Sequence, residues 1–168
     1  MQRASMPLRM RIGALGTLSL LVAAGLTASP VMTTPAHAAY GPCNTTSWRD
    51  VPTLGGKNEY KIPARSGNGI SCYMGYREGS SSAVKALQQA ITMCYPGTWA
   101  ARKINSDGID GIYGTDTVEA VRWLQINEFE LAGSADGVYG PQTRGKMRWP
   151  HYYDRGALLN DCSNPSTL

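Results

Sequence analysis

The chain has 168 residues and a formal net charge of +4, from 16 Lys and Arg residues against 12 Asp and Glu residues. This length allows one domain with an extension, and a basic balance would suggest a nucleic-acid partner. Three of the Arg residues, however, lie in an N-terminal leader that holds no acidic residue. The remaining chain is almost neutral, so we expect no nucleic-acid partner.

The leader, residues 1–38, has the pattern of a secretory signal peptide. Its three Arg residues precede an apolar run over residues 12–28, and the triplet Ala36-His37-Ala38 predicts cleavage before Ala39. A retained membrane anchor is the alternative, but the apolar run is short for a membrane span. We therefore expect a secreted protein, extracellular or associated with the cell wall, with no membrane contact after cleavage.

An irregular N-terminal extension is predicted for residues 39–71, which are rich in Gly, Pro, Ser, Thr and Asn. One short strand, Glu59–Ile62, interrupts it. For residues 150–168 we predict a C-terminal tail that is held by a disulfide.

All four cysteines follow the leader, and an even number in an exported chain predicts two disulfides. Three pairings are open, and we favour Cys72–Cys94 with Cys43–Cys162. The first would join the segment before a helix to the end of that helix, and the second would join the two ends of the mature chain. The sequence has no Cys-x-x-Cys motif and no paired His, so we expect neither a metal nor another cofactor.

Three segments carry the apolar spacing of amphipathic helices: Ser82–Met93, Thr115–Asn127 and Pro141–Arg148. The Ser residues before the first segment supply an oxygen that can cap the helix. Pro at the start of the third segment has the backbone angle that a helix needs there.

A short phrase occurs twice, as D-G-I-Y-G-T-D-T over Asp110–Thr117 and as D-G-V-Y-G-P-Q-T over Asp136–Thr143. Each copy follows a related helical phrase, A-V-K-A-L-Q over Ala83–Gln88 and A-V-R-W-L-Q over Ala120–Gln125. Asp-Gly makes a tight turn in which Gly takes a positive φ, and the Thr of each phrase can bond back to the entry of the helix. The final Gln of each helical phrase is expected to bind nearby loop backbone. The pattern predicts a repeated turn–helix unit.

These coupled motifs resemble the peptidoglycan-binding domain found beside bacterial cell-wall hydrolases, over about residues 72–149. The resemblance implies a mainly α fold, a small three-helix orthogonal bundle, and the role of holding a protein on the bacterial cell wall. Two features depart from the family pattern. The link Tyr95–Ile109 is longer than usual, and no catalytic domain is attached, because the extension at 39–71 is too short for one.

Candidate ligand-binding residues follow from the chemistry of peptidoglycan, which offers sugar faces to aromatic rings and carboxylates to Arg. Arg122 and Trp123 lie off the buried stripe of their helix, and Tyr113 and Tyr139 occupy equivalent turns. The candidates are Tyr113, Arg122, Trp123, Tyr139, Trp99 and Arg102. The alternatives are that both Tyr residues pack in the core and that Trp123 packs under the extension.

The predicted function is that of a secreted, non-catalytic, monomeric module that binds cell-wall peptidoglycan. An interaction protein or inhibitor that regulates a cell-wall hydrolase is the alternative, and an unrecognised hydrolase is a weaker one. We expect no enzyme, because His151 is the one His after the leader, too few for a zinc peptidase, and no paired carboxylates suit a glycosidase. No base is evident for a Ser or Cys nucleophile.

Overall fold

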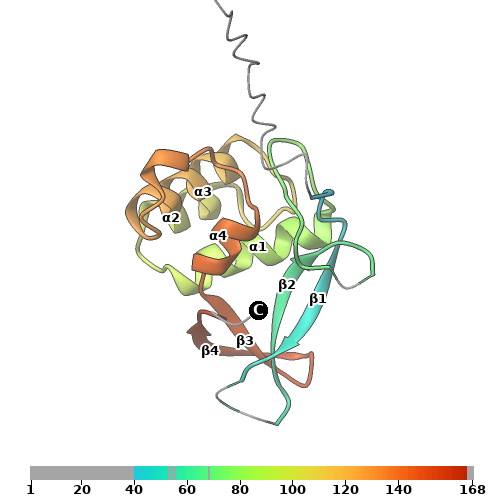
Figure 1. Cartoon of the computed structure of the whole chain (residues 1–168). Helices are drawn as coiled ribbons and strands as arrows, with labels where there is room; N and C mark the ends of the chain where they lie inside the picture. The colour runs from blue at the N-terminus through green and yellow to red at the C-terminus, as the bar shows by residue number, and fades with distance from the viewer. Residues whose placement is uncertain (1–39, 53, 55, 68, 166–168) are drawn as a thin grey trace, which may run out of the picture. The chain divides into compact units, whose positions relative to one another are not determined.

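A computed structural model describes residues 40–165 except 53, 55 and 68. The predicted signal peptide lies outside the described residues. Within them the chain forms four α-helices and one four-stranded antiparallel sheet of order β1-β2-β3-β4. Figure 1 shows the helices grouped together, with the sheet at one end of that group. The predicted mainly α, three-helix bundle is therefore wrong.

The sheet is built almost entirely from the segment that was predicted to be an irregular extension and the segment that was predicted to be a C-terminal tail. The first hairpin comprises β1 (Thr45–Asp50) and β2 (Asn58–Ala64), and the second comprises β3 (Trp149–Tyr153) and β4 (Ala157–Ser163). The hairpins join where β2 pairs with β3. The predicted strand at 59–62 is confirmed and is longer. The pairing was missed because its two halves lie at opposite ends of the described chain, where no local pattern links them.

Three of the helices occur where the sequence predicted them: α1 (Ser81–Cys94), α3 (Thr115–Asn127) and α4 (Pro141–Lys146). The fourth, α2 (Trp99–Asp107), lies inside the link that was predicted to be a long loop. A single 3-10 turn, η2 (Ala132–Ser134), follows α3.

Local sequence explains where α1 and α2 begin and where α2 ends. The Ser80 hydroxyl accepts from the Ala83 N–H at 3.3 Å, and the Thr98 hydroxyl accepts from the Ala101 N–H at 3.2 Å. Each cap satisfies an N–H of a first helical turn. Gly108, with φ of 80°, ends α2.

The disulfides are Cys43–Cys72 and Cys94–Cys162, so the predicted pairing is wrong. Cys43 lies beside Cys72 because the chain around them pairs, with the Cys43 N–H donating to the Tyr73 carbonyl at 2.9 Å. Strand β4 carries Cys162, which bonds to the end of α1. Both disulfides form because the sheet and the segments beside it bring their cysteines together, and the sequence did not predict this sheet.

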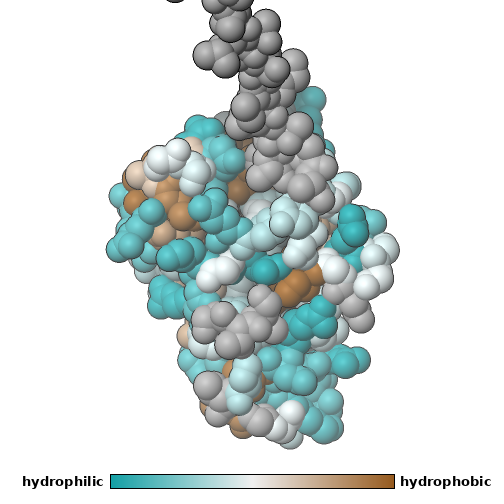
Figure 2. Space-filling model, viewed as in Figure 1, coloured by the Kyte–Doolittle hydropathy of each residue, from teal (hydrophilic) through white to brown (hydrophobic). Residues whose placement is uncertain are grey.

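One hydrophobic core joins the helices to the sheet. Leu87 and Ile91 of α1 belong to the same buried cluster as Tyr60 and Ile62 of β2 and Trp149 of β3. Helix α1 contacts all four strands and also α2. Figure 2 shows a mostly hydrophilic face, with its largest apolar area over the helical part.

Candidate functional site

The first repeated turn is held by one carboxylate and one amide. Asp110 Oδ1 accepts from the Ile112 N–H and from Gln88 Nε2, each at 2.8 Å. Gln88 Oε1 accepts from the Gly111 N–H at 2.9 Å. The Ile112 N–H, and next the Gln88 amide, hold the pKa of the Asp110 carboxyl below its usual value. Asp110 therefore forms the turn, and Gln88 binds loop backbone as predicted.

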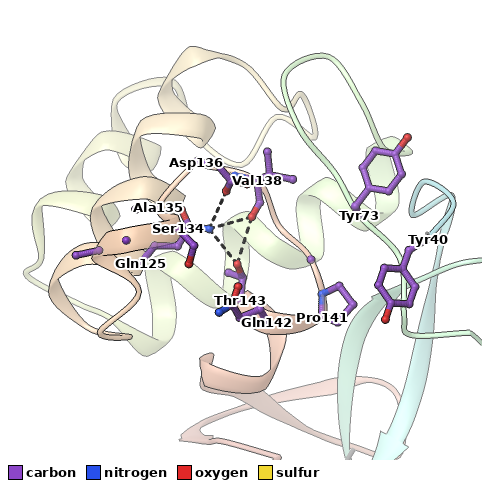
Figure 3. Close-up of a pocket in the computed structure, with 13 residues that line it drawn as sticks. Tyr40, Tyr73, Gln125, Ser134, Ala135, Asp136, Val138, Pro141, Gln142 and Thr143 are labelled. Atoms are coloured by element: carbon purple, nitrogen blue, oxygen red, sulfur yellow. Dashed lines mark hydrogen bonds between the residues drawn. The ribbon is translucent and has the colours of Figure 1, made fainter. Parts of the chain in front are cut away.

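The second turn repeats this arrangement atom for atom. Asp136 Oδ1 accepts from the Val138 N–H at 2.8 Å and from Gln125 Nε2 at 3.1 Å, and Gln125 Oε1 accepts from the Gly137 N–H at 2.8 Å. Gln125 Nε2 also lies 3.1 Å from the Thr143 hydroxyl oxygen (Figure 3). Both turns are thus rigid parts of the fold, with side chains already committed to the turn itself.

The Thr of each phrase completes its turn. The Thr117 hydroxyl donates to the Ile112 carbonyl, and the Thr143 hydroxyl donates to the Val138 carbonyl, both at 3.2 Å. The predicted bond from each Thr to the entry of its helix is confirmed.

Tyr113 and Tyr139 are buried in the core. The Tyr113 hydroxyl donates to the Gly137 carbonyl at 2.9 Å and accepts from the Tyr139 N–H at 3.1 Å, so it ties the two turns together. The Tyr139 hydroxyl has no hydrogen-bond partner among the described residues, and its ring packs edge-on against Trp149. Burial raises the pKa of both hydroxyls. In this conformation neither ring is open to a ligand.

Arg122 and Trp123 differ in their exposure. Arg122 is exposed, and its Nη2 donates to the Asp136 carbonyl at 3.0 Å, which places it beside the second turn. Trp123 is half-buried and packs against the hydrophobic core. The structure therefore does not bring the two side chains together as one binding surface.

Trp99 and Arg102 lie on α2. The Trp99 side chain is exposed, and the Lys103 ammonium lies 5.9 Å from the centre of its ring. Arg102 is exposed and its guanidinium donates to the Gly97 carbonyl of the preceding turn. Lys103 in turn lies 3.0 Å from Asp116, which ties α2 to α3.

A pocket lies beside each repeated turn, and the two are lined by equivalent residues. The first, of about 190 Å³, includes Gln88, Asp110 and Thr117, and the second, of about 680 Å³, includes Gln125, Asp136 and Thr143. Helix α2 contributes Ile104 and Asp107 to the first pocket and narrows it. The second pocket is of a size typical of ligand sites, and the first is below it.

We name the second pocket the turn-2 groove. Its lining residues are Tyr40, Tyr73, Gln125, Ala132, Gly133, Ser134, Ala135, Asp136, Val138, Gly140, Pro141, Gln142 and Thr143. In Figure 3, Tyr40 and Tyr73 stand on one side, with Ser134 and Asp136 on the other. None of the six sequence candidates lines it. The repeated phrase predicted the turn that the groove lies beside. The two Tyr residues come from outside the repeat, and no sequence motif predicted that they would line the groove.

The disulfide Cys43–Cys72 supports the tyrosine side of the groove. Tyr73 follows Cys72 directly, and its N–H donates to the Gly41 carbonyl at 3.2 Å. Met74 then exchanges two backbone hydrogen bonds of 2.9 Å with Tyr139, which fixes this segment to the second turn. The groove is therefore assembled from two distant parts of the chain.

A Ser–His–Asp cluster, unforeseen from the sequence, lies in the second hairpin. His151 Nε2 lies 2.8 Å from the Ser163 hydroxyl, and His151 Nδ1 lies 3.3 Å from Asp161 Oδ2. The Ser163 hydroxyl is also 2.6 Å from the Tyr60 hydroxyl. His151 Nδ1 makes no hydrogen bond within the described residues, although Asp161 is near, and the ring is buried. None of the three lines a pocket described above, so the cluster is best explained as packing between β2, β3 and β4.

The described residues contain no group of three or more His, Cys, Asp or Glu side chains that could hold a metal ion. Their helices are also too short or too polar for any of them to cross a membrane.

Comparison with known families decides the nature of the segment that holds both turns. Residues 80–147 match the family model described as "Putative peptidoglycan binding domain". This segment belongs to that family. The match covers both repeated turns and ends before β3, so the resemblance read from the motifs is confirmed. Neither the comparison with curated proteins nor that with solved structures found a match.

Proposed function

We propose that the protein is a secreted, non-catalytic module that binds bacterial peptidoglycan through the turn-2 groove. The family match over residues 80–147 carries the peptidoglycan part of the proposal. The family is one of binding domains, which supports a role without catalysis. Two disulfides and the leader pattern support an extracellular or cell-wall location.

The groove is the preferred site because of its larger volume, about 680 Å³ against about 190 Å³ for the first pocket. The equivalent pocket at the first turn is smaller and is narrowed by α2. Exposed Ser134 and Gln142 supply hydroxyl and amide groups at the rim of the groove. Arg122 lies beside the second turn but does not line the groove.

Sedimentation with purified sacculi tests the proposal. The secreted protein, with both disulfides formed, is expected to pellet with sacculi. Gln142→Trp fills the groove with a bulky ring and should move most of the protein into the supernatant. Asn105→Trp is the matched control, since Asn105 is also an exposed amide on a helix but lines neither pocket.

Failure of the unaltered protein to pellet would overturn peptidoglycan binding. Equal loss for both Trp variants would overturn the groove as the site. The turbidity of the sacculus suspension, followed in the same samples, should stay constant, and a falling trace would contradict the non-catalytic role.

A further inference from the structure

The two sides of the turn-2 groove differ in chemistry. One side carries the rings of Tyr40 and Tyr73, and Tyr40 is 38% exposed. The other side carries the Ser134 hydroxyl and the Gln142 amide, with Pro141 between the sides (Figure 3). Aromatic faces pack well against apolar C–H surfaces, and hydroxyls and amides both donate and accept hydrogen bonds.

No cationic side chain is among the groove-lining residues that the structure describes. Two Arg side chains beside the second turn bind backbone carbonyls: Arg122 donates to the Asp136 carbonyl and Arg144 donates to the Ile70 carbonyl at 2.7 Å. The one ionisable acid of the lining, Asp136, accepts from the turn itself. A ligand with free carboxylates would therefore meet an acidic group and no bidentate partner.

The groove thus combines aromatic faces with neutral hydrogen-bonding groups. Peptidoglycan has two chemically distinct parts, a glycan of N-acetylated sugars and stem peptides that carry carboxylates. Sugar units have apolar faces and a rim of hydroxyl and amide groups, which match both sides of the groove. A volume of about 680 Å³ lies within the range of sites that enclose a small organic ligand.

We propose that the turn-2 groove binds the glycan of peptidoglycan, as neutral N-acetylated sugar units stacked on Tyr40 and Tyr73, and not the stem peptide. This inference rests on the proposed function, since it names which part of peptidoglycan the same site takes. It goes beyond the family match, which does not distinguish the two parts.

Calorimetry with two soluble probes tests the inference, with the secreted, disulfide-bonded protein in both titrations. The probes are the N-acetylglucosamine tetramer and a free stem tetrapeptide. The tetramer is expected to bind and to release the protein from sacculi, and the tetrapeptide is expected to do neither.

Three Tyr variants locate the binding. Tyr40→Ala should weaken binding of the tetramer about tenfold, the size of one aromatic contact. Tyr40→Phe should retain it, because the ring and not the hydroxyl makes the contact. Tyr76→Ala should also retain it, since Tyr76 is 54% exposed and does not line the groove.

Each contrary result has a distinct meaning. If the protein binds the tetrapeptide and not the tetramer, and still pellets with sacculi, the glycan inference is overturned and the proposed function stays intact. The same holds if sacculi retain the protein but the tetramer does not compete. Equal weakening by Tyr40→Ala and Tyr76→Ala would overturn the assigned stacking. If sacculi do not retain the protein, the proposed function fails and this inference fails with it.

Discussion

The residues that the two turns share stabilise the fold more than they contribute groups for binding a ligand. Gly137 has φ of 75°, and a Cβ added there would lie 2.6 Å from the Val118 carbonyl oxygen. Gly111, in the equivalent place, has φ of 81°, and its added Cβ would lie 2.9 Å from the Ser81 carbonyl oxygen. The shared Asp-Gly phrase is thus explained by backbone geometry and close packing of each turn against a helix.

Replacing Gly137 by Ala should lower the free energy of unfolding by about 2–4 kcal/mol. The left-handed backbone costs about 1 kcal/mol for a residue with a side chain, and the contact with Val118 adds strain. Gly145→Ala is the control, because Gly145 lies within α4 with nothing near its added Cβ, and Ala favours a helix by about 1 kcal/mol. Urea unfolding of both variants checks this, and an unchanged midpoint for Gly137→Ala would contradict it.

The carboxyl of Asp110 gives the first turn a dependence on acid pH. Its pKa is lower in the folded protein than in the unfolded chain, where an Asp titrates near about 3.9. The stabilisation is therefore complete above the unfolded value and is lost as the pH falls through the folded value.

Asp110→Asn should consequently destabilise the protein at neutral pH and lose less of its stability on acidification. Urea unfolding from about pH 6 to pH 2 measures the difference between the two proteins. The difference in the free energy of unfolding should be constant near pH 6 and should shrink only as the pH falls below the pKa of an unfolded Asp. A difference that does not change with pH would contradict the role assigned to this carboxylate.

At the scale of elements, the sequence predicted segments with strong local patterns and missed those that depend on distant partners. Helices α1, α3 and α4 have caps, apolar stripes or an N-terminal Pro, and all three were found. Helix α2 also has a cap, Thr98, and a terminal Gly108, but its buried face uses small Ala100 and Ala101, which weaken the apolar spacing. Strand β3 pairs locally with β4, but its pairing with β2 joins distant parts of the chain and depends on tertiary structure.

The candidate site was predicted in the same uneven way. The Asp-Gly turns and the two Gln residues were foreseen as structure, and the groove indeed lies on the second of them. Tyr40 and Tyr73 were not foreseen, because no periodicity or motif connects them with a turn more than half the described chain away. Trp123 was a candidate for ligand binding because it lies off the buried stripe of its helix, yet tertiary packing half-buries it.

Helix α2 sets the difference between the two turns. Lys103 lies 3.0 Å from Asp116 and 3.2 Å from Glu119, and these bonds raise the pKa of the Lys103 ammonium. Ile104 is buried and lines the first pocket. In the equivalent place before the second turn the chain has the three-residue η2, whose residues line the larger pocket, so two similar turns present pockets of different size.

At the scale of the whole molecule, the two disulfides have separable tasks. Cys43–Cys72 joins residues 29 apart, and Cys94–Cys162 joins residues 68 apart. The chain-entropy model assigns about 3.6 kcal/mol to the shorter loop and about 4.4 kcal/mol to the longer one. Only the shorter loop borders the tyrosine side of the turn-2 groove.

Paired Ser variants should separate stability from binding. Cys94→Ser with Cys162→Ser should lower the melting temperature more, because the longer loop is released. Cys43→Ser with Cys72→Ser should weaken retention on sacculi more, because Tyr40 and Tyr73 lose their support. Calorimetric melting measures the stability, and sacculus sedimentation at a temperature below the melting range of every variant measures the binding. A single pair that is worse in both would contradict this division of tasks.

The bond between Cys43 and Cys72 also has a consequence for when the protein becomes active. Thiols stay reduced in the cytosol and pair in oxidising compartments. If the chain is exported as proposed, the tyrosine side of its groove is incomplete during synthesis and becomes fixed only after crossing the membrane. Oxidation would then act as a maturation step, so that a newly made chain travels without adhesive capacity and acquires it on arrival at the wall.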